Sequence, residues 1–416
     1  MSTTLVHEVH DMWPATLIEL GGMKESHPFI KVLQKAENDA YKKSDAVVSI
    51  PQHAEPYMRE HGLKEGKFYH IPNGVVKEEW ENTKEIPEKM SEVFAKLHQE
   101  QKFIVGYFGG HALSNALDIL LDAAKLLQEN DDIRIVMVGK GVEKERLIQR
   151  CGHENIDNII FLDAVDKRCI PNLLKHFDCI YMGTSDSPLY RFGLGLNKFY
   201  DAMMSAKPVV LSTNAKKTII EQYKCGIVVP AGDAQGIKDS IEKIFSMPED
   251  EKNQLGNNGK TAVQQNFMYN KLSEDFVHAM QNPKIKNILL INHYAGSPEM
   301  GMEFRPYYFA REWIKAGYRV DIVAADYSHL RVKNPSITKD FEEEIIDGIH
   351  YHWVHTGTYS GNGAKRAITM FQFVGKLRLH AGRIANTLKP DVIITSSTYP
   401  LDTYAGQKIK KYCNKK

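Results

Sequence analysis

Two glycine-containing segments are the clearest candidates for binding an anion. In one of them, IRIVMVG (133–139) runs into KGVEKERL, so Gly139 and Gly141 separate an apolar segment from a helix-like one, with Lys140 and Lys144 close by. Glycine lets the backbone approach a ligand closely, and the first turn of a helix attracts anions. The pattern predicts an anion-binding turn, although a tight strand–helix turn without a ligand would read the same way.

A second turn of this kind lies earlier in the chain. FIVGYFG (103–109) is followed by Gly110, His111 and a helix-like segment that begins near Asn115. An imidazole and an amide can both donate and accept hydrogen bonds. This segment repeats the strand–Gly–Gly–helix arrangement, with Gly109 and Gly110 at its turn.

A third segment, RFGLGLNKFYDAMMSAKPVV (191–210), carries polar residues at the start of an expected helix. Asn197 and Lys198 are followed one turn later by Asp201. A carboxylate there can accept hydrogen bonds from the hydroxyl groups of a ligand. A carboxylate on a solvated helix surface is the alternative interpretation of Asp201.

The remaining candidates come from two segments far apart in the sequence. HYAGSPEMGMEFRPYYFARE (293–312) contains Gly301 and Arg305, and LVHEVHDMWP (5–14) contains His10 and Asp11. Both segments follow apolar strands, and open α/β sheets bind ligands at the carboxyl ends of their strands. Structural alternatives are a histidine buried in the strand and an arginine paired with a nearby carboxylate.

Short apolar strands alternate with helices along the whole chain, which predicts two parallel sheets covered on both faces. One sheet is expected from 103–109, 133–139, 158–162, 179–183, 208–212 and 226–230. The other is expected from strands near 4–10, 46–50, 68–71, 287–292, 319–325, 349–355 and 391–396. The predicted fold class is α/β with two doubly wound, Rossmann-like domains.

The order of these segments is unusual. Residues 286–325 read as the opening strand, glycine loop, helix and second strand of a doubly wound domain, yet they lie in the last third of the sequence. Placing YCNKK directly before STTLVHEV restores a normal alternation of strands and helices. We therefore predict a circularly permuted chain, in which the strands at 4–10 and 287–292 share one sheet and Met1 lies near Lys416.

The same pattern sets the expected domain boundaries. Residues 1–75 and 286–416 are predicted to form one discontinuous domain, and residues 76–265 the other. Residues 266–285 are expected to be a crossover helix and its junction.

Composition narrows the class of protein. The chain has 416 residues and a formal net charge of +1, which argues against nucleic acid as a partner. Its five cysteines show no CxxC spacing, so we expect a reduced, cytoplasmic protein without a cysteine zinc site. No apolar run reaches the length of a membrane span. Any membrane contact is expected to be peripheral.

One stretch does suggest a membrane contact. Residues 363–390 contain six basic residues and no acid: Lys365, Arg366, Lys376, Arg378, Arg383 and Lys389. Apolar residues are interleaved with them, as in a helix that lies on an anionic membrane surface. The alternative is a helix packed on its own sheet with a solvated basic face.

Taken together, HYAGSPEMGMEFRPYYFARE, EVHDMWP, HIPNGV, IVMVGKGVEKERL and LNKFYDAMMSAKPVV resemble the family-four retaining glycosyltransferases of the GT-B fold. The nearest subgroup acts in bacterial surface polysaccharide assembly, and the resemblance covers nearly the whole chain in rotated order. It implies two facing Rossmann-like domains, with the nucleotide sugar mainly on the second and the acceptor mainly on the first. It also implies no cofactor and no metal.

The resemblance assigns roles to the residues named above. Catalytic positions are His10, Asp11, Gly301 and Arg305, next to the transferred sugar and the diphosphate. Donor-binding positions are Gly110, His111, Gly139, Lys140, Lys144, Ala164, Val165, Asn197, Lys198 and Asp201, of which Ala164 and Val165 lie in the loop that contacts the base.

The chain departs from the family at two points. His111 and Asn115 stand where the broad family has an arginine and a lysine, and Gly193 stands at the first glutamate of its paired-glutamate motif. The diphosphate charge would then be met by His111, Lys140, Lys144 or Lys198.

The expected function is transfer of a hexosyl or N-acetylhexosaminyl group, with retention, from a nucleotide sugar that we expect to be UDP-linked. The acceptor is expected to be a lipid-linked or other saccharide in cell-surface polysaccharide synthesis, so the enzyme would work at the inner face of the plasma membrane. Two alternatives stay open: a non-catalytic nucleotide-sugar-binding subunit, and a nucleotide-sugar epimerase of the same fold. The sequence does not identify the sugar, the linkage or the oligomeric state.

Overall fold

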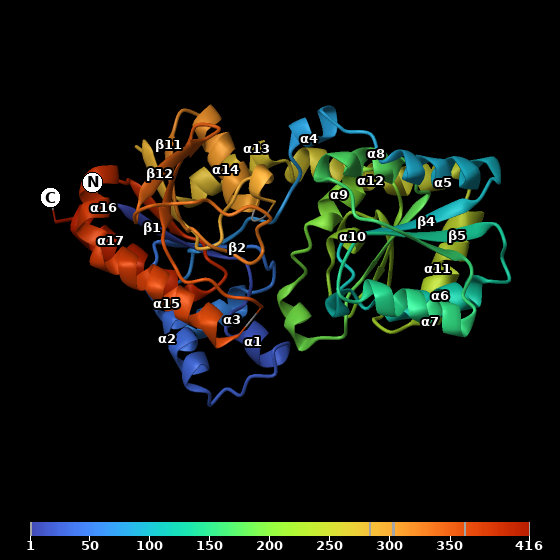
Figure 1. Ribbon diagram of the computed structural model, residues 1–416, viewed down its shortest axis with the longest axis horizontal. Helices are drawn as coiled ribbons and strands as arrows, with labels where there is room; N and C mark the ends of the chain where they lie inside the picture. The colour runs from blue at the N-terminus through green and yellow to red at the C-terminus, as the bar shows by residue number, and fades with distance from the viewer. Residues whose placement is uncertain (1, 283, 302–303, 362, 416) are drawn as a thin grey trace. The chain divides into compact units, whose positions relative to one another are not determined.

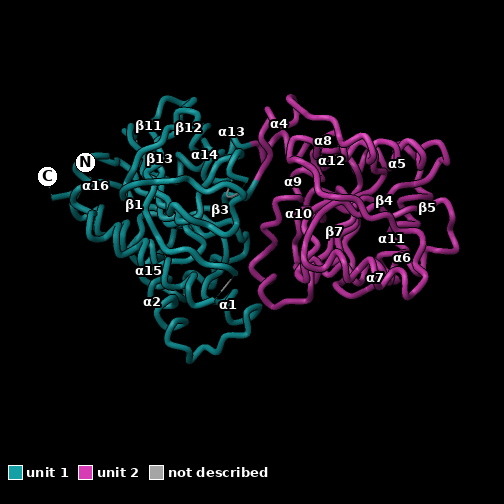
Figure 2. The backbone as a smooth tube through the Cα atoms, in the orientation of Figure 1, with its two compact units in different colours: residues 1–73, 269–416 teal, residues 74–268 magenta. Residues whose placement is uncertain are grey.

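A computed structural model describes residues 2–282, 284–301, 304–361 and 363–415. The chain forms two compact units, shown in different colours in Figure 2. Unit 1 contains residues 1–73 and 269–416, and unit 2 contains residues 74–268. Residues 266–285, which were expected to be a separate junction, are divided between the units at residue 269. The helix α13 (Tyr269–Ala279) belongs to unit 1, where Trp313 Nε1 donates to the carbonyl oxygen of Ser273 at 3.4 Å.

Unit 1 is built on an eight-stranded sheet with the order β12-β13-β11-β10-β14-β1-β2-β3. The strands are β1 (Thr4–Val9), β2 (Ala46–Ser49), β3 (Phe68–His70), β10 (Asn287–Ile291), β11 (Arg319–Ala325), β12 (Glu342–Ile346), β13 (Ile349–Val354) and β14 (Val392–Thr395). The prediction that the strands at 4–10 and 287–292 share one sheet is confirmed. All neighbours are parallel except β12, which pairs with β13 in the antiparallel sense. The sequence did not suggest β12, because an acidic edge strand lacks an apolar pattern.

The order of the strands in the unit 1 sheet bears on the predicted permutation of the chain. Counted from β10, the parallel strands follow the Rossmann order 3-2-1-4-5-6, with β10 first and β1 fifth. The two ends of the described chain lie together, since the Thr3 amide donates to Asn414 Oδ1 at 2.8 Å. Met1 and Lys416, whose proximity was predicted, lie outside the described residues.

Helices cover both faces of the unit 1 sheet (Figure 1). One face packs on a core that includes Leu33, Phe373, Ile384 and Ile409, each from a different helix. The helices of this unit are α1 (Ala15–Glu19), α2 (Pro28–Lys43), α3 (Glu55–Glu60), α13, α14 (Phe304–Lys315), α15 (Ala364–Leu379), α16 (Ala381–Leu388) and α17 (Thr403–Cys413). The burial of one apolar side of each helix against apolar strands is the main stabilising contribution.

Unit 2 has a six-stranded parallel sheet in the order β6-β5-β4-β7-β8-β9, which is the Rossmann order counted directly along the chain. All six predicted strands are present: β4 (Phe103–Phe108), β5 (Ile133–Val138), β6 (Ile159–Leu162), β7 (Cys179–Gly183), β8 (Val209–Ser212) and β9 (Gly226–Val229). Every neighbouring pair of these strands is parallel. Their order reverses between β4 and β7, so the loops after these two strands diverge there.

The helices of unit 2 form a layer on each side of the sheet (Figure 1). They are α4 (Lys77–Glu81), α5 (Glu88–Gln99), α6 (Leu117–Leu127), α7 (Lys144–Glu154), α8 (Ile170–Lys175), α9 (Lys198–Met204), α10 (Ile219–Gln222), α11 (Ala234–Ser246) and α12 (Glu249–Asn266). One core contains Phe94, Leu173 and Val263, and the other contains Leu120, Leu147 and Ile237. None of the helices in the described residues of the whole chain is long and apolar enough to cross a membrane.

Candidate functional site

The anion-binding turns predicted for unit 2 lie side by side at the carboxyl edge of its sheet. They follow the neighbouring strands β4 and β5, and the first of them lies where the strand order reverses, which is where open α/β sheets bind ligands. The turns touch: a Cβ atom on Gly139 would lie 1.9 Å from the carbonyl oxygen of Gly109, and one on Gly141 would lie 2.2 Å from that of His111. Only glycine fits at these positions. Gly139 and Gly141 therefore allow the turn after β5 to lie directly against the turn after β4.

His111 is buried in this pair of turns without a partner for its ring. Its side chain is inaccessible to solvent, and neither Nδ1 nor Nε2 makes a hydrogen bond of good geometry in the described structure, although backbone groups of Gly109 and Lys140 lie close enough to raise the pKa of the ring slightly. Burial, followed by the nearby Lys144 and Lys198 ammonium groups, lowers the pKa of His111, so the ring is neutral at pH 7. A buried polar group normally has a partner. A bound ligand that accepts from one ring nitrogen or donates to the other would supply it.

Lys198 lies at the start of α9, and its side chain reaches the turn after β4. Its Nζ donates to Asn115 Oδ1 at 2.9 Å and to the Tyr107 hydroxyl at 3.3 Å, and it lies 4.6 Å from the centre of the Tyr107 ring. No carboxylate contacts this ammonium within the part of the chain that is described. Burial lowers its pKa to about 8. A partly buried cation without a counter-charge favours binding of an anion.

The other two candidate lysines differ from Lys198. Lys144 Nζ donates to Asp163 Oδ1 at 2.8 Å and to the carbonyl oxygens of Leu162 and Gly139 at 2.9 and 3.1 Å. An ammonium has three N–H groups, and here all three connect the turn after β5 to the end of β6. Lys144 thus holds the turn in place, which makes it a weaker candidate for the diphosphate. Lys140 is exposed, and its backbone carbonyl accepts from the His111 amide at 2.9 Å.

The remaining predicted donor residues lie in two places. Asp201 is one turn after Lys198 on α9, is nine-tenths buried and contacts Lys167 Nζ at 3.3 Å. Asn197 and Ala164 are exposed, whereas Val165 packs on the core. Asp201 therefore forms an ion pair already, and a ribose would share its carboxylate with Lys167.

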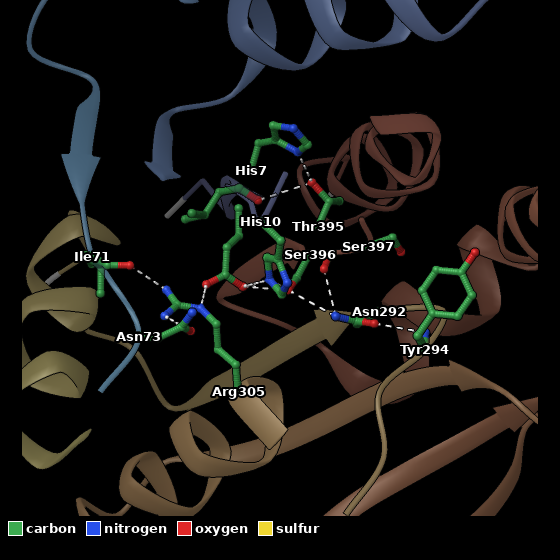
Figure 3. Close-up of polar contacts among 12 residues, drawn as sticks. His7, His10, Ile71, Asn73, Asn292, Tyr294, Arg305, Thr395, Ser396 and Ser397 are labelled. Atoms are coloured by element: carbon green, nitrogen blue, oxygen red, sulfur yellow. Dashed lines mark hydrogen bonds and ion pairs between the residues drawn. The ribbon is translucent and has the colours of Figure 1, made fainter. Parts of the chain in front are cut away.

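A second polar cluster lies at the carboxyl edge of the unit 1 sheet (Figure 3). His10 follows β1, and its Nε2 lies 3.1 Å from Ser396 Oγ and 3.2 Å from Glu8 Oε2. The Ser396 hydroxyl donates to the same Glu8 oxygen at 2.5 Å. Glu8 on β1 and Ser396 after β14 thus fix the orientation of the imidazole. Asp11, the other candidate on this strand end, is exposed.

Arg305 contacts the opposite side of the Glu8 carboxylate (Figure 3). Its Nε donates to Glu8 Oε1 at 2.9 Å, and its terminal nitrogens donate to the carbonyl oxygens of Pro72 and Ile71 at 2.6 and 2.7 Å. Burial is the largest single influence and opposes ionisation of Glu8, but the Arg305 guanidinium, His10 and the Ser396 hydroxyl together outweigh it and lower the pKa of Glu8 to about 2. Arg305 is only 6% exposed. It therefore acts as the partner of a carboxylate, the structural alternative for this residue, and affects His10 through Glu8.

The loop after β10 is held by contacts within unit 1. Asn292 Nδ2 donates to the Ser396 carbonyl at 2.7 Å, and the Tyr351 hydroxyl donates to the Gly296 carbonyl at 2.8 Å. Gly301 ends this loop with a φ of 78°, and a Cβ atom there would lie 2.9 Å from Val332. Gly301 thus shapes the loop and offers a ligand only its backbone.

Three residues of these clusters were not predicted from the sequence. Glu8 and Ser396 orient His10, and Tyr107 contacts Lys198. The sequence could have indicated a role for Glu8, because an acidic residue inside an apolar strand is rarely buried without a partner. Tyr107 had none, since aromatic residues are common in strands.

Comparisons with known proteins fit this geometry. Residues 89–262, within unit 2, match the family described as glycosyl transferases group 1. Solved structures with a similar fold include Anabaena HepE in complex with UDP, with 19% identity over 67% of this chain and 72% of that one and a TM-score of 0.53. Sucrose-phosphate synthase from Thermosynechococcus elongatus has 18% identity over 66% and 67%, with a TM-score of 0.51. The Escherichia coli structure described as trehalose-6-phosphate bound with UDP-2-fluoro glucose has 12% identity over 68% and 74%, with a TM-score of 0.52.

At these identities the likeness shows the fold: the chain has the α/β GT-B fold with two Rossmann-like units. No curated protein matches the sequence.

Proposed function

We propose that this protein is a glycosyltransferase that uses a nucleotide sugar, with UDP as the nucleotide. One observation carries the proposal. Within the unit that matches the glycosyl transferases group 1 family, Lys198 is a partly buried cation without a carboxylate contact, and the buried His111 ring has no hydrogen bond of good geometry. Both lie beside the two glycine turns. A diphosphate would supply the missing negative charge, and its oxygens would accept from the imidazole.

In the proposed reaction, the chain acts mainly through charges that are already in place. The Lys198 ammonium and the backbone N–H groups of the glycine turns would stabilise the negative charge that develops on the departing diphosphate. Such preorganised groups are usually the largest contribution to catalysis. Asp201 would accept from ribose hydroxyls, and the loop of Ala164 and Val165 would contact the base. His10, oriented by Glu8 and Ser396, would contact the transferred sugar. We propose retention of configuration and no metal in this chemistry.

We also propose that the chain is a circularly permuted form of this fold. The support is the strand order, because unit 1 follows the Rossmann order only when counting begins at β10 and continues through β14 into β1. Unit 2 follows the same order without any such shift.

A thermal-shift screen tests the proposed function. UDP and UDP-sugars should raise the melting temperature, because a ligand at a hundredfold excess over its Kd stabilises the folded state by about 2.7 kcal/mol. If UDP, GDP, ADP and CMP all leave the melting temperature unchanged, the proposal is wrong. Product analysis then separates the alternatives: an epimerase would interconvert UDP-sugars, and a binding subunit would bind them without turnover.

For the acceptor, we propose a lipid-linked saccharide at an anionic membrane surface. The support lies on α15, where Ile368, Phe371 and Leu379 are 54%, 48% and 81% exposed. Lys365 and Arg378 are exposed on the same helix, three residues before Ile368 and seven residues after Phe371, spacings that place them on the same side as these apolar side chains. Exposed apolar and basic side chains together fit an anionic lipid surface.

Only part of the basic run contributes to that surface. Arg366 donates to the Tyr294 hydroxyl at 3.1 Å, and Lys376 forms an ion pair with Asp340 at 2.8 Å. These two side chains help to hold unit 1 together. Replacing them would change the fold as well as the charge.

The membrane proposal predicts a loss of vesicle binding on changing this helix face. Phe371→Ser with Leu379→Ser should reduce co-sedimentation with phosphatidylglycerol vesicles several-fold, since each apolar side chain contributes roughly 1.5–3 kcal/mol when fully buried. Ile345→Ser is the matched control, because Ile345 is 61% exposed on β12. Equal binding by the double variant and the parent would show that α15 does not face a membrane.

A further inference from the structure

One face of the outer strands of unit 1 carries a compact group of potential metal ligands. His350 and His352 lie two residues apart on β13, so both side chains point to the same face. The register pairs Asp321 of β11 with His350, and Glu343 of β12 with His352. Paired residues on neighbouring strands share a face. The four side chains therefore gather on one side of the sheet.

The distances within this group suit a single ion. His352 Nε2 lies 2.8 Å from Asp321 Oδ1, and His350 Nδ1 lies 2.6 Å from Glu343 Oε1. One ligand atom from each of Asp321, Glu343 and His352 lies within 4.8 Å of the other two. Zinc binds nitrogen and oxygen at about 2.0–2.2 Å, so its tetrahedral ligands are roughly 3.4 Å apart. Small rotations of these side chains would reach that spacing.

The surroundings of the group resemble those of known metal sites. Asp321 is 1% and His352 is 9% exposed, whereas the Glu343 side chain is 48% exposed. The group thus has a fixed, buried side and an open side through which an ion can enter. Glu343 also has an outer partner in His350, whereas the Arg319 guanidinium, 3.0 and 3.1 Å from Asp321, places a positive charge beside the group. Such outer partners orient ligands in metal sites.

We propose that Asp321, Glu343 and His352 bind a divalent first-row transition-metal ion, Zn²⁺ above all, with water in the fourth position. One imidazole nitrogen and two carboxylate oxygens are ligands that such ions accept. The ion would bind Nε2 of the neutral His352 ring, which would then carry its proton on Nδ1.

The site has a structural role in this proposal. Asp321 and His352 lie on β11 and β13, which β10 separates from β14 and β1, the strands that Ser396 and His10 follow. An ion there would join the antiparallel edge strand β12 to β13 and β11. The proposal is independent of the glycosyltransferase function, and either can fail without the other.

Arg319 provides a sharp test, because its charge opposes a cation beside Asp321. Removing that charge in Arg319→Gln should strengthen zinc binding, by roughly threefold to tenfold for a charge a few ångströms away near the surface. If Asp321, Glu343 and His352 formed only a hydrogen-bonded network, Arg319→Gln would not bind zinc more strongly than the parent. Its ion pair would simply be lost.

The experiment is calorimetric titration of ZnCl₂ into the full-length protein after dialysis against a chelator. We expect one strong site in the parent, a Kd at least about tenfold higher in His352→Ala and Glu343→Gln, and a lower Kd in Arg319→Gln. Glu343 lies on an exposed edge strand, so its variant keeps the test valid if His352→Ala does not fold. With Co²⁺, intense visible absorption should appear in the parent and be lost in the same variants.

His355→Ala is the matched control. His355 Nδ1 contacts Asp326 Oδ2 at 2.7 Å, which is the same kind of pair, but no third ligand joins it among the residues the structure describes. This variant should bind zinc like the parent. The proposal is overturned if the parent binds no zinc, if His352→Ala and Glu343→Gln bind it as the parent does, or if Arg319→Gln weakens binding.

Discussion

Replacing Lys198 with Met should raise the Kd for UDP by about tenfold to a hundredfold. Among the described residues, this ammonium is the partly buried cation next to the glycine turns that has no carboxylate contact, and a hydrogen bond to a charged group contributes about 1.5–3 kcal/mol. Methionine keeps most of the side-chain volume and removes the charge. Isothermal titration of UDP into the parent and the variant measures the change.

The pH dependence of the same measurement identifies the charge as the cause. Burial lowers the pKa of Lys198 to about 8, so the free protein has this positive charge below that pH and loses it above. UDP affinity of the parent should therefore fall as the pH rises above about 8, and Lys198→Met should lack this fall. Lys102→Met is the control, because Lys102 precedes β4 and pairs with Asp131 at 2.6 Å. If Lys198→Met binds UDP as the parent does, the placement of the diphosphate is wrong.

Replacing Arg305 with Met should destabilise unit 1 by about 3–5 kcal/mol, the usual cost of leaving a buried charge without its partner. Glu8 is 1% exposed, and Arg305 is its main counter-charge. Urea unfolding at pH 7 measures the free energy. Arg59→Met is the comparison: Arg59 forms an exposed pair with Glu55, and its loss should cost no more than about 1 kcal/mol.

Lowering the pH should also show the contribution of the Glu8–Arg305 ion pair to stability. In the parent, the pKa of Glu8 is lowered from 4.5 to about 2, so its stabilisation is complete above pH 4.5 and is lost only as the pH falls through about 2. In Arg305→Met, burial without the guanidinium raises the pKa of Glu8, and protonation then relieves the unpaired charge. The difference in stability between parent and variant should shrink between pH 7 and pH 4. A constant difference over that range would mean that Arg305 contributes through packing alone.

Much of the fold could be predicted from the sequence, because apolar strands and amphipathic helices have periodic signals. The placement of the strands at 4–10 and 287–292 in one sheet also followed from the order of segments. β12 could not be predicted, since its acidic sequence (Glu342–Ile346) gives no apolar alternation and its pairing depends on β13. The domain boundary near residue 269 depends on contacts of α13 that no local pattern reveals.

The candidate site was predictable only in part. The glycines and Lys198 lie where the strand–turn–helix pattern indicated. The sequence could not distinguish Lys198, which has no carboxylate contact, from Lys144, which is held by Asp163 and two carbonyl oxygens. That difference depends on side-chain positions after folding. The role of Arg305 likewise became clear only from its contact with Glu8.

Hydrogen–deuterium exchange with and without UDP tests the central claim most directly, because it locates the ligand on the chain. The account predicts slower exchange in the turns that follow β4 and β5 and at the start of α9, which are residues 109–116, 139–144 and 197–201. The same protection should be lost in Lys198→Met at the same UDP concentration. Unchanged exchange in all three segments, or protection confined to unit 1, would contradict the account.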